Sequence, residues 1–512
     1  MPAADLVLKN ARVITMNAAR PAAQMVAVEG DLISYVGSDK GLDSFVGPGT
    51  RVIDCAGRAV LPGFSDAHLH LFSLVGKLLS IGLGLDSVRS IGDIKEKIRE
   101  KALKIAPGAW ISGADYNEFY LEGKRCPTRW NLDEAASDHP VIISHRSLHA
   151  CVLNSMALEL AGIGMETPEP EGARIERDLS TGEPNGILIG TGMLSHIRSK
   201  VMPRFSQEEL VESAALADTC LLSHGITSFQ DASINNDLDR WETVCDLKLN
   251  ADLLGRITMM AGAPHWKDFQ KRGLKTGSGD NLMRLGAVKF LLEAHPDQAE
   301  LNEAALAVHQ AGFQLAFHAV AESMVEAAVM ALEYLDKHSP VMKRRHRIEH
   351  CAECPPYLLE RLKKLGAVIV TQPPFIYYSG ERYLATVLES QLPWLYRIKS
   401  PLEKGIVVAG SSDAPVAPVN PLMGIYAAVT RRAESGQVLL PEERLNINQA
   451  LALYTFNAAY ASFEENTKGS IAPGKLADLV VLSDNPTNVP PEQIKDIKVE
   501  ITIIGGEVVW EA

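Results

Sequence analysis

The feature that most constrains the fold is a series of eight strand-like segments that alternate with helical stretches through the middle of the chain. Each segment is short and apolar, and amphipathic patterns over 207–223, 300–311, 322–337 and 355–365 fill several of the connections. Alternation of this kind gives a parallel sheet, and eight such units are the number in a TIM barrel. The expected strands are 60–64, 225–230, 256–260, 286–291, 314–317, 346–349, 367–371 and 405–409.

Both ends of the chain have another texture, in which short strand-like runs follow one another without helices. These runs are 6–15, 25–36, 51–61, 477–482 and 499–509. Isolated strands are not stable alone, so we expect residues 1–60 and 465–512 to form one small β-sandwich domain. The barrel domain is then expected over 61–464.

The gap between the first two expected barrel strands is too long for a simple connection. We therefore expect an inserted α/β subdomain at about 79–204. The predicted fold class is α/β: a (β/α)8 TIM barrel with this insertion, plus the β-sandwich formed by both termini.

The charge balance narrows the class of partner. Lys and Arg number 50 against 63 Asp and Glu, a formal net charge of −13, which disfavours nucleic acid and anionic membranes. The seven cysteines do not suggest a disulfide framework, and the first residues lack the apolar core of a secretory signal. We expect a cytoplasmic protein with a small-molecule partner, and a homodimer is one oligomeric state left open.

The motif LPGFSDAHLHLF places His68 and His70 two residues apart after the first expected barrel strand. Residues i and i+2 of an extended segment project to one face, so both imidazoles can bind one metal ion. Local hydrogen bonding explains an isolated HxH pair equally well. The position at a strand end favours a functional site, because TIM-barrel active sites form there.

Polar side chains end four other expected strands, namely Lys289, His318, His350 and Asp413. With the histidine pair they form a donor set suited to borderline divalent metals. A protonated lysine cannot bind a metal, but a neutral amine that reacts with carbon dioxide becomes a carbamate, which can bridge two metals. Two alternatives stay open: Lys289 forms an ordinary ion pair with Glu293, or Glu293 is itself the bridging carboxylate.

These motifs resemble the amidohydrolase superfamily over nearly the whole chain. Within that superfamily, the chain is similar to a branch with a long insertion, which includes N-substituted formamide deformylases. The motifs that carry this similarity are LPGFSDAHLH, PTRWNLDEAASDHPVIISHRSLHACVLNSMALELAGI, GITSFQDAS, RIEHC, GSSDAPVAPVNPL and GSIAPGKLADLVVL. The chain departs from the branch after Lys289, where Asp-Gly-Ser is usual, and at Ser147 and Leu148, where Asp-Gly is usual. Both departures concern substrate choice.

The resemblance implies two divalent metal ions, with zinc expected. It implies that His68, His70 and Asp413 bind the more buried ion, that His318 and His350 bind the second ion, and that carbamylated Lys289 bridges them. Asp413 would also serve as the catalytic base.

The residues and the resemblance together predict a hydrolase that cleaves a C–N bond in an amide or N-substituted formamide-like substrate. A metal-bridging hydroxide attacks the carbonyl, and Asp413 passes a proton to the departing amine. The same site could open a cyclic amide, deaminate a ring, or cleave an ester or carbamate. A mononuclear site and a catalytically silent binding protein on this fold are further alternatives.

Four more residues are candidates for contact with substrate. His149 and Asn154 lie in the inserted subdomain, where they either line the pocket or organise the insertion. Tyr377 and Tyr378 are candidates for an apolar wall of the pocket.

Overall fold

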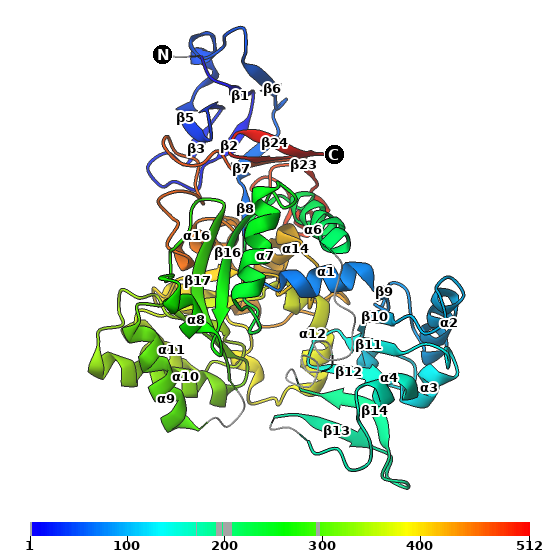
Figure 1. The fold of residues 1–512 in the computed structure, drawn as a ribbon. Coiled ribbons are helices and arrows are strands. Elements are labelled where there is room, and N and C mark those ends of the chain that lie inside the picture. Colours follow the sequence, from blue (N-terminus) through cyan, green and yellow to red (C-terminus); the bar gives the residue numbers. More distant parts are fainter. Residues whose placement is uncertain (1–2, 170–171, 191–196, 198–206, 293–296) are drawn as a thin grey trace. The chain divides into compact units, whose positions relative to one another are not determined.

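The computed structural model describes residues 3–169, 172–190, 197, 207–292 and 297–512 (Figure 1). The chain divides into two compact units, Met1–Leu71 with Ala217–Ala512, and Phe72–Leu216. Among the described residues, no helix is long and apolar enough to cross a membrane.

The described part of the first unit contains a nearly closed barrel of eight parallel strands. Neighbours pair in the order β8-β15-β16-β17-β18-β19-β20-β21, and β21 lies beside β8 where the ring closes. The TIM barrel predicted from the sequence is thereby confirmed. The strands are β8 (Phe64–Leu69), β15 (Ile226–Asp231), β16 (Arg256–Gly262), β17 (Met283–Leu291), β18 (Leu315–Ala319), β19 (Arg347–His350), β20 (Val368–Thr371) and β21 (Val408–Gly410).

Helices occupy the connections between these strands. The Asp297 side chain caps α9 by accepting from the backbone N–H groups of Ala299 and Glu300, and α10 buries a stripe that includes Val325 and Leu332. The helices are α6 (Gln207–Leu222), α7 (Leu238–Leu249), α8 (Trp266–Lys271), α9 (Gln298–Gln310), α10 (Glu322–His338), α11 (Pro356–Lys364), α12 (Pro374–Thr386), α13 (Lys399–Glu403), α14 (Pro421–Thr430), α15 (Ile447–Leu453) and α16 (Phe456–Ala461).

The first barrel strand begins later than the sequence predicted. The expected strand at 60–64 falls mostly on β7 (Ala59–Pro62), which pairs with strands of the terminal sheets, and the barrel strand β8 begins at Phe64. Only Gly63 separates these two buried strands, so the apolar residues within 60–64 span the break between them. In consequence, His68 lies within β8 and His70 is the first residue after it.

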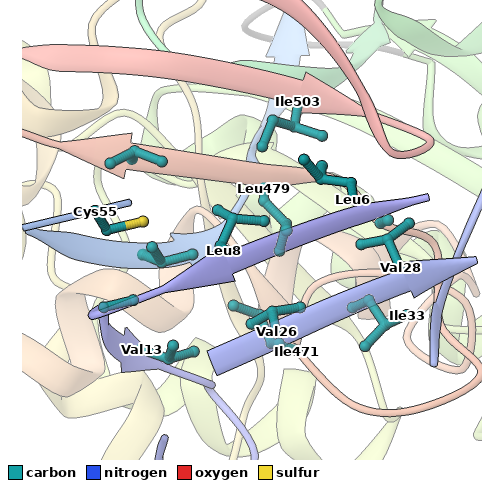
Figure 2. Close-up of a cluster of buried hydrophobic side chains, with 14 of the residues drawn as sticks. Leu6, Leu8, Val13, Val26, Val28, Ile33, Cys55, Ile471, Leu479 and Ile503 are labelled. Atoms are coloured by element: carbon teal, nitrogen blue, oxygen red, sulfur yellow. The ribbon is translucent and has the colours of Figure 1, made fainter. Parts of the chain in front are cut away.

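Strands from both ends of the chain form two sheets around one apolar core, which confirms the predicted β-sandwich. The sheet orders are β5-β4-β1-β6 and β24-β23-β22-β7-β2-β3. Leu8, Val26, Leu479 and Ile503 are fully buried between them (Figure 2). The strands are β1 (Leu6–Lys9), β2 (Arg12–Ile14), β3 (Ala22–Ala23), β4 (Met25–Glu29), β5 (Leu32–Gly37), β6 (Arg51–Asp54), β22 (Leu479–Leu482), β23 (Val499–Ile504) and β24 (Glu507–Glu511).

The second unit is an α/β subdomain built on a sheet in the order β13-β14-β12-β11-β10-β9. Helix α2 begins with a capping box between Ser90 and Asp93, and it buries Ile94 and Ile98. The elements of residues 71–189 are α1 (Leu71–Leu79), β9 (Ile81–Gly82), α2 (Ile91–Ala102), β10 (Ile111–Tyr116), α3 (Arg129–Asp133), β11 (Val141–His145), β12 (Ala150–Leu153), α4 (Ser155–Leu160), β13 (Arg174–Arg177) and β14 (Pro184–Ile189).

Candidate metal centre

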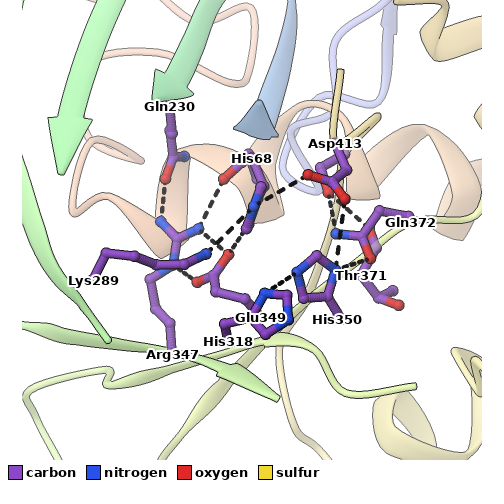
Figure 3. Close-up of polar contacts among 12 residues, drawn as sticks. His68, Gln230, Lys289, His318, Arg347, Glu349, His350, Thr371, Gln372 and Asp413 are labelled. Carbon is purple, nitrogen blue, oxygen red and sulfur yellow. Dashed lines mark hydrogen bonds and ion pairs between the residues drawn. The ribbon is translucent and has the colours of Figure 1, made fainter. Parts of the chain in front are cut away.

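The carboxyl ends of the barrel strands bring the six predicted ligand residues together. His68 lies in β8, Lys289 in β17, His318 in β18 and His350 at the end of β19. Asp413 follows β21, and Figure 3 shows these side chains converging on one another. The separate segments of sequence therefore meet in one polar cluster within the barrel.

The tightest group in this cluster is His68, His70 and Asp413. Asp413 Oδ1 lies 3.4 Å from His68 Nε2 and 3.1 Å from His70 Nε2. One ligand atom from each residue lies within 4.8 Å of the others, so the three could hold a metal ion. Two imidazoles and one carboxylate are a donor set that zinc accepts.

The Nδ1 atom of each of three histidines is occupied by a neighbouring side chain. Histidines that bind metals usually engage their second ring nitrogen in this way, which fixes the tautomer and the ring orientation. The partners are Glu349 for His68, Ser233 for His70 at 3.1 Å, and Gln372 for His350 at 2.8 Å. The chemistry of the donor set therefore fits a metal ion.

The other three predicted ligands lie beside this group. His350 Nε2 is 3.0 Å from His318 Nδ1, and Lys289 Nζ is 3.4 Å from His68 Nε2. Burial lowers the pKa of Lys289 to about 8, although the carboxylates of Glu349 and Asp413 oppose this effect. A buried lysine of this kind has a neutral fraction near neutral pH.

Asp413 is held in its anionic form. Burial acts to raise the pKa of its carboxyl group, but the hydrogen bond from His70 and the charges on the nearby imidazoles outweigh burial and lower it well below the usual range. Asp413 also has a φ of 57°, in the left-handed region that Asp adopts more readily than most residues. This turn follows β21 directly.

Sequence reasoning missed Glu349, Arg347, Gln372 and Ser233. The segment HRIEH did carry a signal, because Arg347 and Glu349 are two apart in a strand and so share one face. Regular alternation would place His350 on the opposite face from Glu349. The φ of 68° at His350 breaks that alternation, and no pattern of residue types shows it.

The remaining barrel candidates are less closely tied to the cluster. Tyr377 and Tyr378 lie in α12, where their ring centroids are 5.0 Å apart and Tyr377 also packs against Tyr426. Both are half-buried beside an apolar cluster, so their predicted role in a substrate pocket stays a prediction. Glu293 lies outside the described residues.

His149 and Asn154 belong to the second unit. The backbone N–H of His149 donates to Ser147 Oγ at 3.2 Å. Asn154 is fully buried, and its amide accepts from two backbone N–H groups and donates to two backbone carbonyls. These bonds use the whole amide of Asn154 and favour a role in organising the insertion.

We expect Asn154→Ala to destabilise the second unit, because it leaves two buried donors and two buried acceptors without their partner. The free energy of unfolding measured with urea should fall by about 1–3 kcal/mol. Ser137→Ala, at an exposed serine of the same unit, should change it by less than about 0.5 kcal/mol. Unchanged stability with weakened substrate binding would instead assign Asn154 to the pocket.

Comparison with known proteins identifies the family. The model of the amidohydrolase family matches residues 51–510. The chain belongs to the amidohydrolase family. This amidohydrolase is 28% identical to N-substituted formamide deformylase of Arthrobacter pascens, over 99% of this chain and 98% of that protein.

Two further likenesses cover nearly the whole of this amidohydrolase. It is 28% identical to the putative amidohydrolase YtcJ of Bacillus subtilis strain 168, over 95% of this chain and 96% of that protein. The crystal structure of an uncharacterized metal-dependent hydrolase from Pyrococcus horikoshii OT3 superposes with a TM-score of 0.76 at 24% identity, covering 95% of this chain and 99% of that one. The second likeness supports the fold.

Proposed function

We propose that this amidohydrolase cleaves the C–N bond of a small amide or N-substituted formamide-like substrate. The reaction would use two divalent metal ions, for which zinc is the expected metal. The observation that carries the proposal is the group of His68, His70 and Asp413, in which one carboxylate oxygen lies within 3.4 Å of both Nε2 atoms. The full-length likeness to a formamide deformylase supports the choice of a C–N bond.

The proposed ligands are the residues that the barrel gathers. His68, His70 and Asp413 would hold one ion, and His318 and His350 would hold the other. When bound, the metal supplies Lewis acidity, which makes water acidic enough to attack near neutral pH and polarises the substrate carbonyl.

Lys289 would join the two positions as a carbamate. Its neutral Nζ attacks carbon dioxide, forms an N–C bond and loses one proton, which leaves a carboxylate on the side chain. Its place beside His68 and its lowered pKa support this role, because only the neutral amine reacts. An uncarbamylated Lys289 would correspond to a mononuclear site.

Asp413 would move the proton that hydrolysis requires. Its anionic carboxylate accepts a proton from the attacking water at one oxygen and later donates it to the departing amine nitrogen. Without that transfer, the amine is a poor leaving group. The imidazole of His70, whose Nε2 lies 3.1 Å from Asp413 Oδ1, orients this carboxylate.

The test is the metal content of protein purified without chelators and with bicarbonate present. Elemental analysis should find about two zinc ions per chain, as expected for a carbamate-bridged pair. Lys289→Ala should bind fewer ions, and Lys248→Ala, which removes a half-buried lysine elsewhere in the barrel unit, should keep both. Activity on a panel of amides, formamides, cyclic amides and esters then identifies the bond.

Absence of metal from the wild-type protein would contradict the proposal and favour a silent binding protein. Bound zinc with hydrolysis of esters alone would contradict the choice of a C–N bond.

A further inference from the structure

Three of the four imidazoles in the candidate metal centre, those of His68, His70 and His350, differ in the chemistry that holds their Nδ1 atoms. His68 Nδ1–H donates to a carboxylate, that of Glu349. His70 Nδ1 faces the neutral hydroxyl of Ser233, and His350 Nδ1–H donates to the neutral amide of Gln372. Among these Nδ1 atoms, and within the described residues, only that of His68 is hydrogen-bonded to a carboxylate (Figure 3). The Asp413 carboxylate lies farther from His350 Nδ1, at 4.0 Å, than the Gln372 amide does.

Glu349 is itself held rigidly from the other side. The Arg347 guanidinium donates to Glu349 Oε1 at 2.7 Å and to Oε2 at 3.0 Å, and both side chains are at most 1% exposed. Arg347 also donates to Gln230 Oε1 and, at 2.8 Å, to the carbonyl of Ala67. The hydrogen bonds of this buried pair therefore all go to residues of β8, β15 or β19.

The geometry of β19 explains how one strand supplies both a positioning carboxylate and a ligand. Arg347 and Glu349 share a face of the strand, and the left-handed backbone at His350 and Cys351 turns the chain immediately afterwards. His350 consequently reaches His318 while Glu349 reaches His68. The adjacent residues Glu349 and His350 therefore serve the two proposed metal positions, but different groups orient the imidazoles of each position.

A carboxylate that accepts Nδ1–H makes the opposite Nε2 a stronger metal ligand and fixes its tautomer, which a neutral acceptor does less effectively. We propose that Glu349, held by Arg347, makes the metal position served by His68 the tight one, and leaves the position served by His318 and His350 exchangeable. This inference rests on the metal centre of the proposed function. Glu349 is a positioning residue in this scheme.

Zinc titration of the apoprotein tests the inference. Free zinc is set with a competing chelator, and the bound zinc per chain is measured by elemental analysis at each step. The wild type should fill in two steps whose affinities differ at least about tenfold. Glu349→Gln should weaken the tighter step by about 10–100-fold and leave the weaker step within about threefold.

Two further variants separate positioning from general damage. Arg347→Lys keeps the positive charge but loses the two-pronged contact with Glu349, so the same step should weaken by a smaller factor. This variant also serves where Glu349→Gln fails to fold. Glu464→Gln changes another buried glutamate of the barrel unit, 3.0 Å from Lys468, and should alter neither zinc step.

The outcomes distinguish the inference from the proposed function. Two steps of equal affinity, or a tighter step insensitive to both Glu349→Gln and Arg347→Lys, would overturn the inference. Glu349-dependent zinc binding in a protein that hydrolyses no member of the substrate panel would support the inference and overturn the proposed function. A wild type that binds no zinc would overturn both.

Discussion

Asp413→Asn should abolish most turnover and leave the metal centre filled. The amide keeps the size and one oxygen of the carboxylate, so metal content should stay within experimental error of the wild type. The neutral amide of this variant lacks the negatively charged oxygen that would accept the proton from water. Loss of a general acid–base group typically costs about 10²–10⁴-fold in rate. We therefore expect kcat to fall by that factor, with little change in KM.

A matched substitution elsewhere in the barrel unit controls for general effects of removing a buried carboxylate. Asp218 is also buried, and it accepts from the backbone N–H groups of Leu254 and Gly255 rather than from imidazoles. Asp218→Asn should lower stability but keep kcat within about threefold of the wild type. If Asp413→Asn retained more than a tenth of the turnover, Asp413 would not be the base.

Much of the site could be predicted because the barrel fold converts a local pattern into a spatial one. A polar residue at the end of an apolar segment needs no long-range information to be noticed, and parallel strands bring such ends together. Lys289, His318 and His350 were found in this way, and they do converge. The barrel itself could be predicted because strand-like and helical segments alternate along the sequence.

The parts that could not be predicted depend on backbone geometry or on packing between distant segments. The break between β7 and β8 is hidden because only Gly63 separates them and the apolar residues within 60–64 span it. The bond from His68 to Glu349 joins residues 281 positions apart and needs the turn at His350 to form beside a second ligand. Neither leaves a mark in spacing or composition.

The terminal β-sandwich and the barrel are joined by a buried ion pair whose loss should cost more stability than that of any surface pair. Arg256, at the start of β16, donates to both carboxylate oxygens of Asp478 at 2.7 and 2.9 Å, and both side chains are 4% exposed. Asp478 Oδ1 also accepts from the backbone N–H of Gly505 at 2.9 Å. The carboxylate thus links β16 to the segments that flank β22 and β23.

Arg256→Met leaves that carboxylate buried without its counter-charge, and removal of one partner from such a pair typically costs about 3–5 kcal/mol. We expect the free energy of unfolding of the first unit, measured by urea denaturation, to fall by this amount. The double variant Arg256→Met with Asp478→Leu should recover part of the loss, because no buried charge is left unpaired. Asp268→Asn breaks the exposed pair with Lys271 and should cost less than about 1 kcal/mol. A loss as small for Arg256→Met as for Asp268→Asn would show that water reaches Asp478 and that other contacts, such as the bond from Thr502 Oγ1 to the carbonyl of Leu222, hold the sandwich to the barrel.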